Sequence, residues 1–250
     1  MTPRIMGAVA ARVLTQLRHD HRTLAMLLLL PMLLMTLLWW MYDDAALGFD
    51  LLGPALLALF PFIIMFLVTS VTTLRERSSG TLERLLAMPT GKVDFLGGYA
   101  IAFGVVAMVQ SLLAVGLCVL VLDLAIVGPP WVLTVVAVAD ALLGTALGLF
   151  VSAFARTEFQ AVQFMPAVVI PQILLCGLFL PRSQLPPVLE VVSGALPLSY
   201  AVDAMNSVAR SATSDLGGVD PAVWADLGII LAFVVGALVL GAATLRRRTA

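Results

Sequence analysis

The chain has 250 residues, of which 61% are hydrophobic and 12% charged, and its mean hydropathy is +1.07. These values lie far outside the composition of soluble globular domains and indicate a membrane protein. Fourteen Lys and Arg residues against fifteen Asp and Glu residues leave a net charge near −1, which excludes a global basic field for nucleic acid. Cys118 and Cys176 lie in apolar stretches without a His or Cys at metal-ligand spacing, so we interpret both as small buried apolar side chains.

Six stretches are long and apolar enough to cross about 30 Å of hydrocarbon as helices. They are continuously apolar and lack the alternation of barrel strands. The predicted fold is therefore an all-α membrane protein, with one domain over residues 1–250. The predicted spans are 23–42, 51–74, 95–122, 131–153, 159–180 and 222–245. The first apolar run is too long for a typical signal peptide and no small-residue cleavage site follows it, so we expect this span to be retained.

Basic residues indicate the orientation, because short cytoplasmic segments carry the excess of Lys and Arg. One side holds Arg4, Arg12, Arg18, Arg22, Arg75, Arg77, Arg84, Lys92, Arg156, Arg246, Arg247 and Arg248, and the other holds Arg182 and Arg210. The count of twelve against two predicts that both termini are cytoplasmic. The four tryptophans, Trp39, Trp40, Trp131 and Trp224, then fall at outer ends of spans, where indole rings favour the interface.

The first 22 residues have a helical apolar pattern. Met6, Val9, Val13 and Leu17 recur on one face, while the arginines lie mostly elsewhere. We expect an amphipathic helix along the inner interface. The alternative is a solvated basic tail, which would leave many apolar side chains in water.

The sequence gives little support for an enzyme. The two histidines, His19 and His21, both precede the first span, which argues strongly against a Ser–His protease within the membrane. Asp140 is the one carboxylate deep within a span, whereas an aspartate dyad needs two. No GxxxxGK[ST] phosphate loop occurs, so we expect no ATPase site, no catalytic residue and no metal site in this chain.

Asp140 itself has two interpretations. It lies about nine residues into a predicted span, roughly 13 Å deep, where a charge costs at least ~2.5 kcal/mol. It could contact a cationic or hydrogen-bonding substrate or relay protons. Alternatively it is a structural carboxyl, hydrogen-bonded to Ser, Thr or Gln side chains of neighbouring helices, such as Gln110 or Gln163.

Helix breakers and small residues form a second pattern. Proline kinks its helix and frees carbonyl groups, which neighbouring helices or a water-lined cavity must satisfy. Such prolines are Pro31, Pro54, Pro61, Pro166 and Pro171. The pairs Gly144-x-x-x-Gly148 and Ala237-x-x-x-Gly241 let helices approach closely, although neither specifies an interface.

A charged segment follows the second span. It contains Arg75-Glu76, then Gly80-Thr81-Leu82-Glu83, then Leu85, Leu86 and Pro89. The leucines would cluster on one side of a short helix that could seat in a partner's groove, and the alternative is a solvated helix on the headgroups. The segment resembles the conserved cytoplasmic loop of permease subunits of type-2 ATP-binding-cassette (ABC) exporters. It departs from that pattern at Ser78-Ser79, where charged residues are frequent.

A second segment resembles the same family's signature around the outer end of the fifth span. It contains Gly177, Pro181, Pro186-Pro187 and Leu196-Pro197-Leu-Ser-Tyr200. The prolines stop helix continuation, and the apolar residues between them could dip into the outer leaflet. The alternative is an extracellular linker that exposes Val and Leu. With both motifs in order, the resemblance covers nearly the whole chain.

The resemblance implies a half-transporter. Its coupling helix would press into a separate ATPase subunit, and the implied coupling residues are Arg75, Glu76, Gly80, Thr81, Leu82, Glu83, Leu85, Leu86 and Pro89. The pathway hypothesis names Asp140, Pro166, Pro171 and Gln172, and the outer gate of re-entrant helices includes Gly177, Pro181, Pro186, Pro197 and Tyr200.

The implied partners are two ABC ATPase subunits that bind ATP and Mg, a second permease copy or paralogue, membrane lipids and a small amphiphilic substrate. We expect a drug, antibiotic or lipid-like substrate and a bacterial inner membrane. The alternatives are a glycan exporter of the same family and an ATP-independent membrane scaffold, which would have no reason to carry a docking helix.

Overall fold

The computed structural model describes residues 3–42, 48–78, 92–155, 157–210 and 219–244, and in these ranges the regular structure is helical. The helices are α1 (Pro3–His19), α2 (His21–Tyr42), α3 (Gly48–Ser78), α5 (Lys92–Leu120), α6 (Pro130–Ser152), α7 (Glu158–Leu175), η1 (Arg182–Gln184), α8 (Pro187–Gly194), α9 (Pro197–Arg210) and α10 (Pro221–Thr244). Six of them, α2, α3, α5, α6, α7 and α10, are long and apolar enough to cross a membrane. This confirms the predicted all-α membrane fold.

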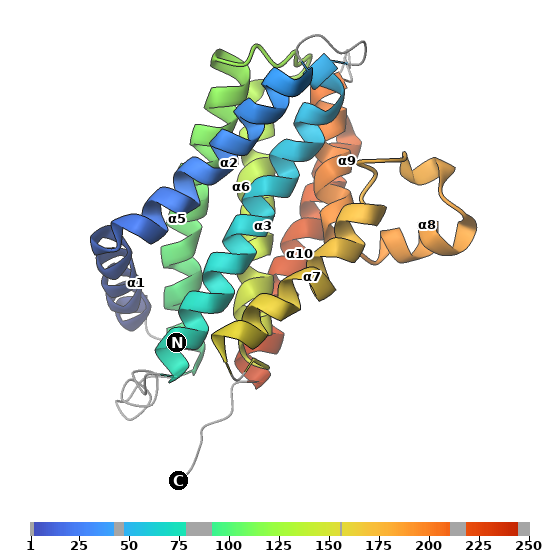
Figure 1. The fold of residues 1–250 in the computed structure, drawn as a ribbon. Coiled ribbons are helices and arrows are strands. Elements are labelled where there is room, and N and C mark those ends of the chain that lie inside the picture. Colours follow the sequence, from blue (N-terminus) through green and yellow to red (C-terminus); the bar gives the residue numbers. More distant parts are fainter. Residues whose placement is uncertain (1–2, 43–47, 79–91, 156, 211–218, 245–250) are drawn as a thin grey trace.

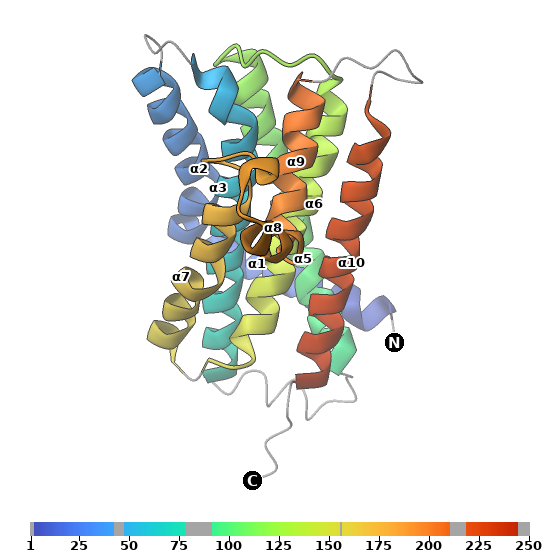
Figure 2. The same cartoon turned by 90° about the vertical axis from the view of Figure 1, so that its right-hand side faces the viewer.

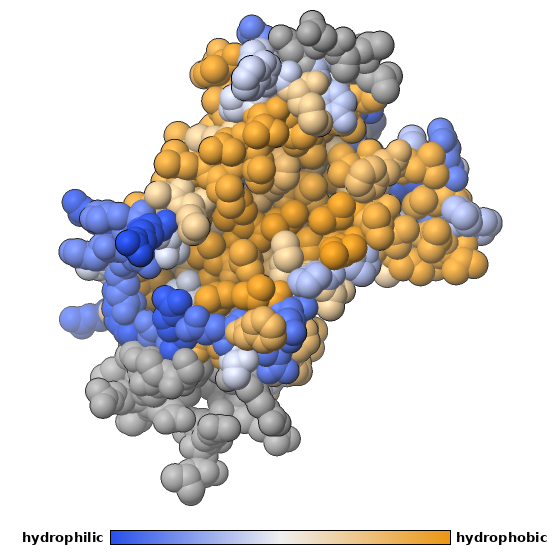
Figure 3. All heavy atoms as spheres, in the orientation of Figure 1, coloured by the Kyte–Doolittle hydropathy of each residue, from blue (hydrophilic) through white to orange (hydrophobic). Residues whose placement is uncertain are grey.

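The six long helices stand side by side, and α1 lies across them (Figures 1 and 2). We call the end where α3 and α10 finish and α5 and α7 begin the basic end, because Arg75 lies in the last turn of α3 and Arg12 pairs with Glu76 of the same turn. The opposite end carries Trp131 and Trp224, whose ring centroids are 6.1 Å apart. The face in Figure 3 is apolar across the middle of the bundle and hydrophilic over α1, as expected of a protein surrounded by hydrocarbon.

The centre of the bundle is α6, packed against α3, α5, α9 and α10. Its contact with α3 depends on Gly144 and Gly148, which lie one turn apart on the same face. A Cβ at Gly148 would lie 2.6 Å from the backbone oxygen of Phe66, and one at Gly144 would clash with the backbone oxygen of Phe62. The pair predicted to permit close approach therefore brings the α6 and α3 backbones together.

The N-terminal helix packs on α5. Val9, Val13 and Leu17 are buried, so the apolar face expected from the sequence is confirmed. The matching surface of α5 contains Gly98, where a Cβ would lie 2.6 Å from the side chain of Val9. Asp20 ends α1 and starts α2, and the Thr23 hydroxyl donates to its carboxylate at 2.6 Å, which lowers the pKa of Asp20.

The fifth span differs from its predicted bounds of 159–180, because α7 ends at Leu175. The chain then passes through η1 to α8, which projects sideways from the bundle, and α9 follows after a bend of 91° (Figure 1). Both α8 and α9 begin with proline, which suits the first helical position since its missing N–H needs no partner there. The ends of the other five spans agree with prediction to within four residues.

Candidate functional site

Most of the predicted coupling segment lies outside the described residues. This applies to Gly80, Thr81, Leu82, Glu83, Leu85, Leu86 and Pro89. Arg75 and Glu76 are described, and they lie in the last turn of α3, immediately before that segment. The structure therefore shows what the start of the segment is attached to.

Glu76 links α3 to α1. One carboxylate oxygen accepts a hydrogen bond from the Arg12 guanidinium at 2.9 Å, and the other accepts from the Gln16 side-chain amide at 3.1 Å. Arg12 and Gln16 are one helical turn apart, so both reach the same carboxylate from one face of α1. The Glu76 side chain is only 14% exposed, which places this ion pair in a partly desolvated contact.

Arg75 links α3 to α7. Its guanidinium donates to both carboxylate oxygens of Glu158, at 3.1 and 3.2 Å. Glu158 is the first residue of α7, and the preceding Thr157 caps the helix by accepting from the Gln160 amide at 3.1 Å. The Arg75 side chain is 63% exposed, so this pair contributes less stability than the Glu76 contact. Two adjacent residues thus connect the end of α3 to two different helices.

Asp140 lies fully buried in α6. Neither of its carboxylate oxygens has a hydrogen-bond partner within the part of the chain that the structure describes. The Gln110 amide instead donates to the backbone oxygen of Leu27 at 3.0 Å, and Gln163 is exposed on α7. A purely structural role for Asp140 predicts that a neighbouring side chain such as one of these glutamines binds its carboxyl group. Neither glutamine does so here.

The other predicted pathway residues lie on α7, on two different faces. Pro166 and Pro171 are exposed on the outward face, together with Ile170. Gln172 is buried, and its carbonyl oxygen accepts from the Leu198 amide at 3.3 Å, so it ties α7 to the start of α9. The pathway residues therefore do not converge on one site within this single chain.

The predicted outer-gate residues surround the junction of α7, α8 and α9. Gly177 adopts φ +93°, a left-handed conformation that glycine accommodates best, directly after α7 ends. The Tyr200 hydroxyl donates to the backbone oxygen of Gly194 at 2.6 Å and so joins α9 to α8. Pro181 precedes η1, Pro186 precedes α8 and Pro197 begins α9.

Further polar contacts fix the same junction. The Ser193 hydroxyl donates to the backbone oxygen of Leu175 at 2.7 Å, which attaches α8 to the end of α7. Arg182 pairs with Asp203 of α9, and its guanidinium carbon lies 5.2 Å from the centroid of the Tyr200 ring. The junction is thus held by hydrogen bonds, an ion pair and a cation–π contact.

Sequence reasoning missed several of these partners. Arg12 and Gln16 carried a usable signal, because polar residues one turn apart on α1 present two donors to one acceptor. Nothing local indicated that Glu76 was that acceptor, since 60 or more residues separate it from both donors. Among the described residues, no group of three or more His, Cys, Asp or Glu side chains is placed to hold a metal ion.

Comparison with known proteins shows which family this chain is similar to. The model of the ABC-2 type transporter family matches residues 6–209. Over 171 residues the chain is 25% identical to the probable multidrug ABC transporter permease YbhS of Escherichia coli, covering 68% of this chain and 45% of that protein. It is 29% identical to the probable multidrug permease YbhR of the same organism over 157 residues, covering 62% of this chain and 42% of the relative.

The chain is also similar to a protein from a second organism. The ABC transporter G family member 20 of Dictyostelium discoideum is 26% identical over 159 residues, which cover 64% of this chain and 22% of that protein. The chain thus spans less than half the length of these relatives. Because the family model covers most of its residues, the chain belongs to the ABC-2 type transporter family and is a multi-pass membrane permease.

Proposed function

We propose that this permease is the transmembrane half of an ATP-driven exporter. It pairs with a second copy or a paralogue and with two separate ATPase subunits, which bind ATP and Mg. The observation that best supports this proposal is the paired attachment at the end of α3, where Glu76 binds α1 and Arg75 binds α7. An ATPase pressing on the segment that follows would move three helices together.

The coupling step follows from these attachments. ATP binding closes the ATPase subunits and displaces the segment that contains Leu82, Leu85 and Leu86. Since α3 continues directly into this segment, the displacement reaches α3 first and then α1 and α7 through the two ion pairs. The complex then shifts between inward-open and outward-open populations.

We propose that the outward face of α7 meets the partner permease and lines the transport pathway. Val162, Pro166, Ile170 and Leu174 are exposed on this face in the single chain. Pro166 cannot donate a backbone hydrogen bond, so the carbonyl of Val162 is free to accept one from a substrate or water. Asp140 would reach the pathway only when the bundle opens, because in this conformation it is fully buried.

The substrate we propose is an amphiphilic drug, antibiotic or lipid-like molecule. The exposed side chains of α7 are mostly apolar, and two relatives are named as multidrug permeases. A glycan exporter would need many hydrogen-bonding side chains along the pathway, and the exposed face of α7 offers chiefly Gln163. An ATP-independent scaffold remains the rival from another class.

The proposed location is a bacterial inner membrane with both termini in the cytoplasm, as the twelve-to-two count of basic residues favours. The basic end of the bundle is then cytoplasmic. Single cysteines at positions 83 and 182 test this orientation with an impermeant thiol reagent applied to intact cells. We expect labelling at 182 and protection at 83, and the opposite pattern would invert the topology.

The test of function targets the coupling segment. The double variant Leu82→Asp and Leu86→Asp places two charges in a contact that excludes water, at a cost of several kcal/mol. We expect loss of ATPase pull-down and of substrate-stimulated ATP hydrolysis in vesicles, with normal membrane insertion. Ser79→Ala serves as the mild control. Undiminished ATPase recovery by the double variant would favour the scaffold.

A further inference from the structure

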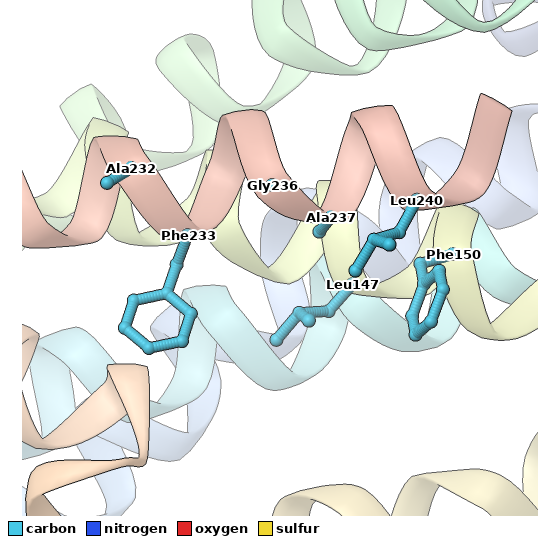
Figure 4. Close-up of a pocket in the computed structure, with 7 residues that line it drawn as sticks. All are labelled: Leu147, Phe150, Ala232, Phe233, Gly236, Ala237 and Leu240. Atoms are coloured by element: carbon cyan, nitrogen blue, oxygen red, sulfur yellow. The ribbon is translucent and has the colours of Figure 1, made fainter. Parts of the chain in front are cut away.

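An open groove with a volume of about 410 Å³ runs between α6 and α10 on the outside of the bundle (Figure 4). We call it the α6–α10 groove and define it by Leu147, Phe150, Phe233, Gly236, Ala237 and Leu240. In the close-up, Phe233 stands at one end and Phe150 at the other, with Leu147 between them. All of these residues are apolar, and none belongs to the coupling, pathway or gate residues described above.

Small residues on α10 create the groove. A Cβ added at Gly236 would meet nothing within 4 Å, whereas one at Gly241 would lie 3.6 Å from the Cα of Phe150. The two helices therefore touch at Gly241, and open space lies beside Gly236 at the edge of their contact. Bulky side chains at Phe233 and Leu240 flank this gap, so a narrow channel remains along α10.

The chemistry of the lining restricts the occupant. The groove opens outward from two membrane-spanning helices, so it faces hydrocarbon rather than water. It offers no hydrogen-bonding side chain, and a polar ligand buried there would lose its hydrogen bonds to water. Its volume lies in the range of sites for small organic ligands. Lining residues recur over about two turns, roughly 10 Å, which suits an extended hydrocarbon chain.

We propose that an acyl chain of an inner-leaflet phospholipid occupies the α6–α10 groove. The groove lies in the second half of α10, which finishes at the basic end of the bundle. The sequence after α10 continues with Arg246, Arg247 and Arg248, which favour an anionic headgroup at this end. The sequence thus favours an anionic phospholipid as the source of the acyl chain. The choice of leaflet rests on the proposed orientation, but binding itself requires neither ATP nor an ATPase.

Photolabelling tests the proposal directly. The full chain is reconstituted in vesicles of phosphatidylethanolamine and phosphatidylglycerol that contain a phosphatidylglycerol with a diazirine on one acyl chain. We expect labelling of Phe233 and Leu240 to exceed labelling of Val235 and Val239, which are exposed on α10 but do not line the groove. The expected excess is about threefold or more, which corresponds to a preference for the groove of about 0.7 kcal/mol.

Two matched glycine variants separate a bound lipid from general contact with the bilayer. Gly236→Leu fills the groove, and Gly228→Leu places the same side chain elsewhere on α10, where a Cβ also meets nothing within 4 Å. We expect Gly236→Leu to remove the excess labelling and Gly228→Leu to retain it. Equal labelling of both sets of residues, unchanged labelling in Gly236→Leu, or cross-linking of the groove to a second copy would each overturn the proposal. None of these outcomes depends on export.

Discussion

Helices α6 and α7 are both apolar spans that carry predicted pathway residues, yet they occupy opposite environments. In the most apolar stretch of each, 72% of α6 is buried within the chain, against 17% of α7. The difference follows from small residues, since Gly144 and Gly148 let α6 enter the centre, whereas prolines and larger side chains line the outward face of α7. Apolarity therefore identifies a span, but the residues that permit close approach determine which neighbours it has.

The largest expected effect is at the centre of the bundle. Gly148→Leu drives a side chain into the Phe66 backbone, which cannot move aside, so we expect a loss of about 3 kcal/mol and a lower Tm in detergent. Ala167→Leu on the exposed face of α7 and Gly116→Leu on α5, where a Cβ meets nothing within 4 Å, should both change stability by less than ~0.5 kcal/mol. Equal losses for all three variants would contradict the contrast between α6 and α7.

The next effect concerns Asp140, whose oxygens have no partner in the described part of the chain. Asp140→Asn preserves size, so insertion and assembly should persist. If the carboxylate contacts cations when the bundle opens, efflux of cationic compounds should fall about tenfold, or 1.4 kcal/mol, because charge-assisted bonds are about twice as strong as neutral ones. Efflux of neutral compounds serves as the internal control. Unchanged efflux of both classes, or loss of assembly, would return Asp140 to a structural role.

Smaller effects are expected where α3 meets its two partners. Glu76→Gln removes the charge from a partly buried contact with Arg12, so we expect a loss of about 1 kcal/mol and weaker stimulation of ATP hydrolysis by substrate. Urea or thermal unfolding in detergent and hydrolysis assays in vesicles measure the two changes. The double variant Arg12→Ala with Glu76→Gln should lose no more than the sum of the single changes.

The smallest effect is expected at the start of α7. Glu158→Gln weakens an exposed pair with Arg75, so we expect a smaller loss of stability than Glu76→Gln causes. Added salt should diminish even this loss, since exposed charges are screened. A loss of stability in Glu158→Gln that equals or exceeds the loss in Glu76→Gln would contradict the proposal that the contact of α3 with α1 is the stronger of the two.

The sequence predicted the membrane fold well because its signals are local. A run of twenty apolar residues determines a span, and the periodicity of Val9, Val13 and Leu17 determines the buried face of α1. Cys118 and Cys176 are buried free thiols, as expected from their apolar neighbours. The motif resemblance led to the family, which the family model then established.

Features that depend on how the helices pack could not be predicted from local sequence patterns. The early end of α7 at Leu175 could not be read from hydropathy, because the residues as far as Leu180 remain mostly apolar. The pairing of Arg182 with Asp203 joins residues 21 positions apart across two helix breaks. The α6–α10 groove arises from an absence of side-chain volume at Gly236, which only the packed structure reveals.

The central claim is that ATP hydrolysis on a partner drives export through the segment after α3. The most direct measurement is uptake of an amphiphilic cationic dye, ethidium, into inside-out vesicles that contain this permease and its co-purified ATPase. We predict uptake with ATP but not with ADP, and loss of ATP-dependent uptake in the Leu82→Asp and Leu86→Asp double variant while Ser79→Ala retains it. Equal uptake with ATP and ADP, or undiminished ATP-dependent uptake in the double variant, would contradict the account.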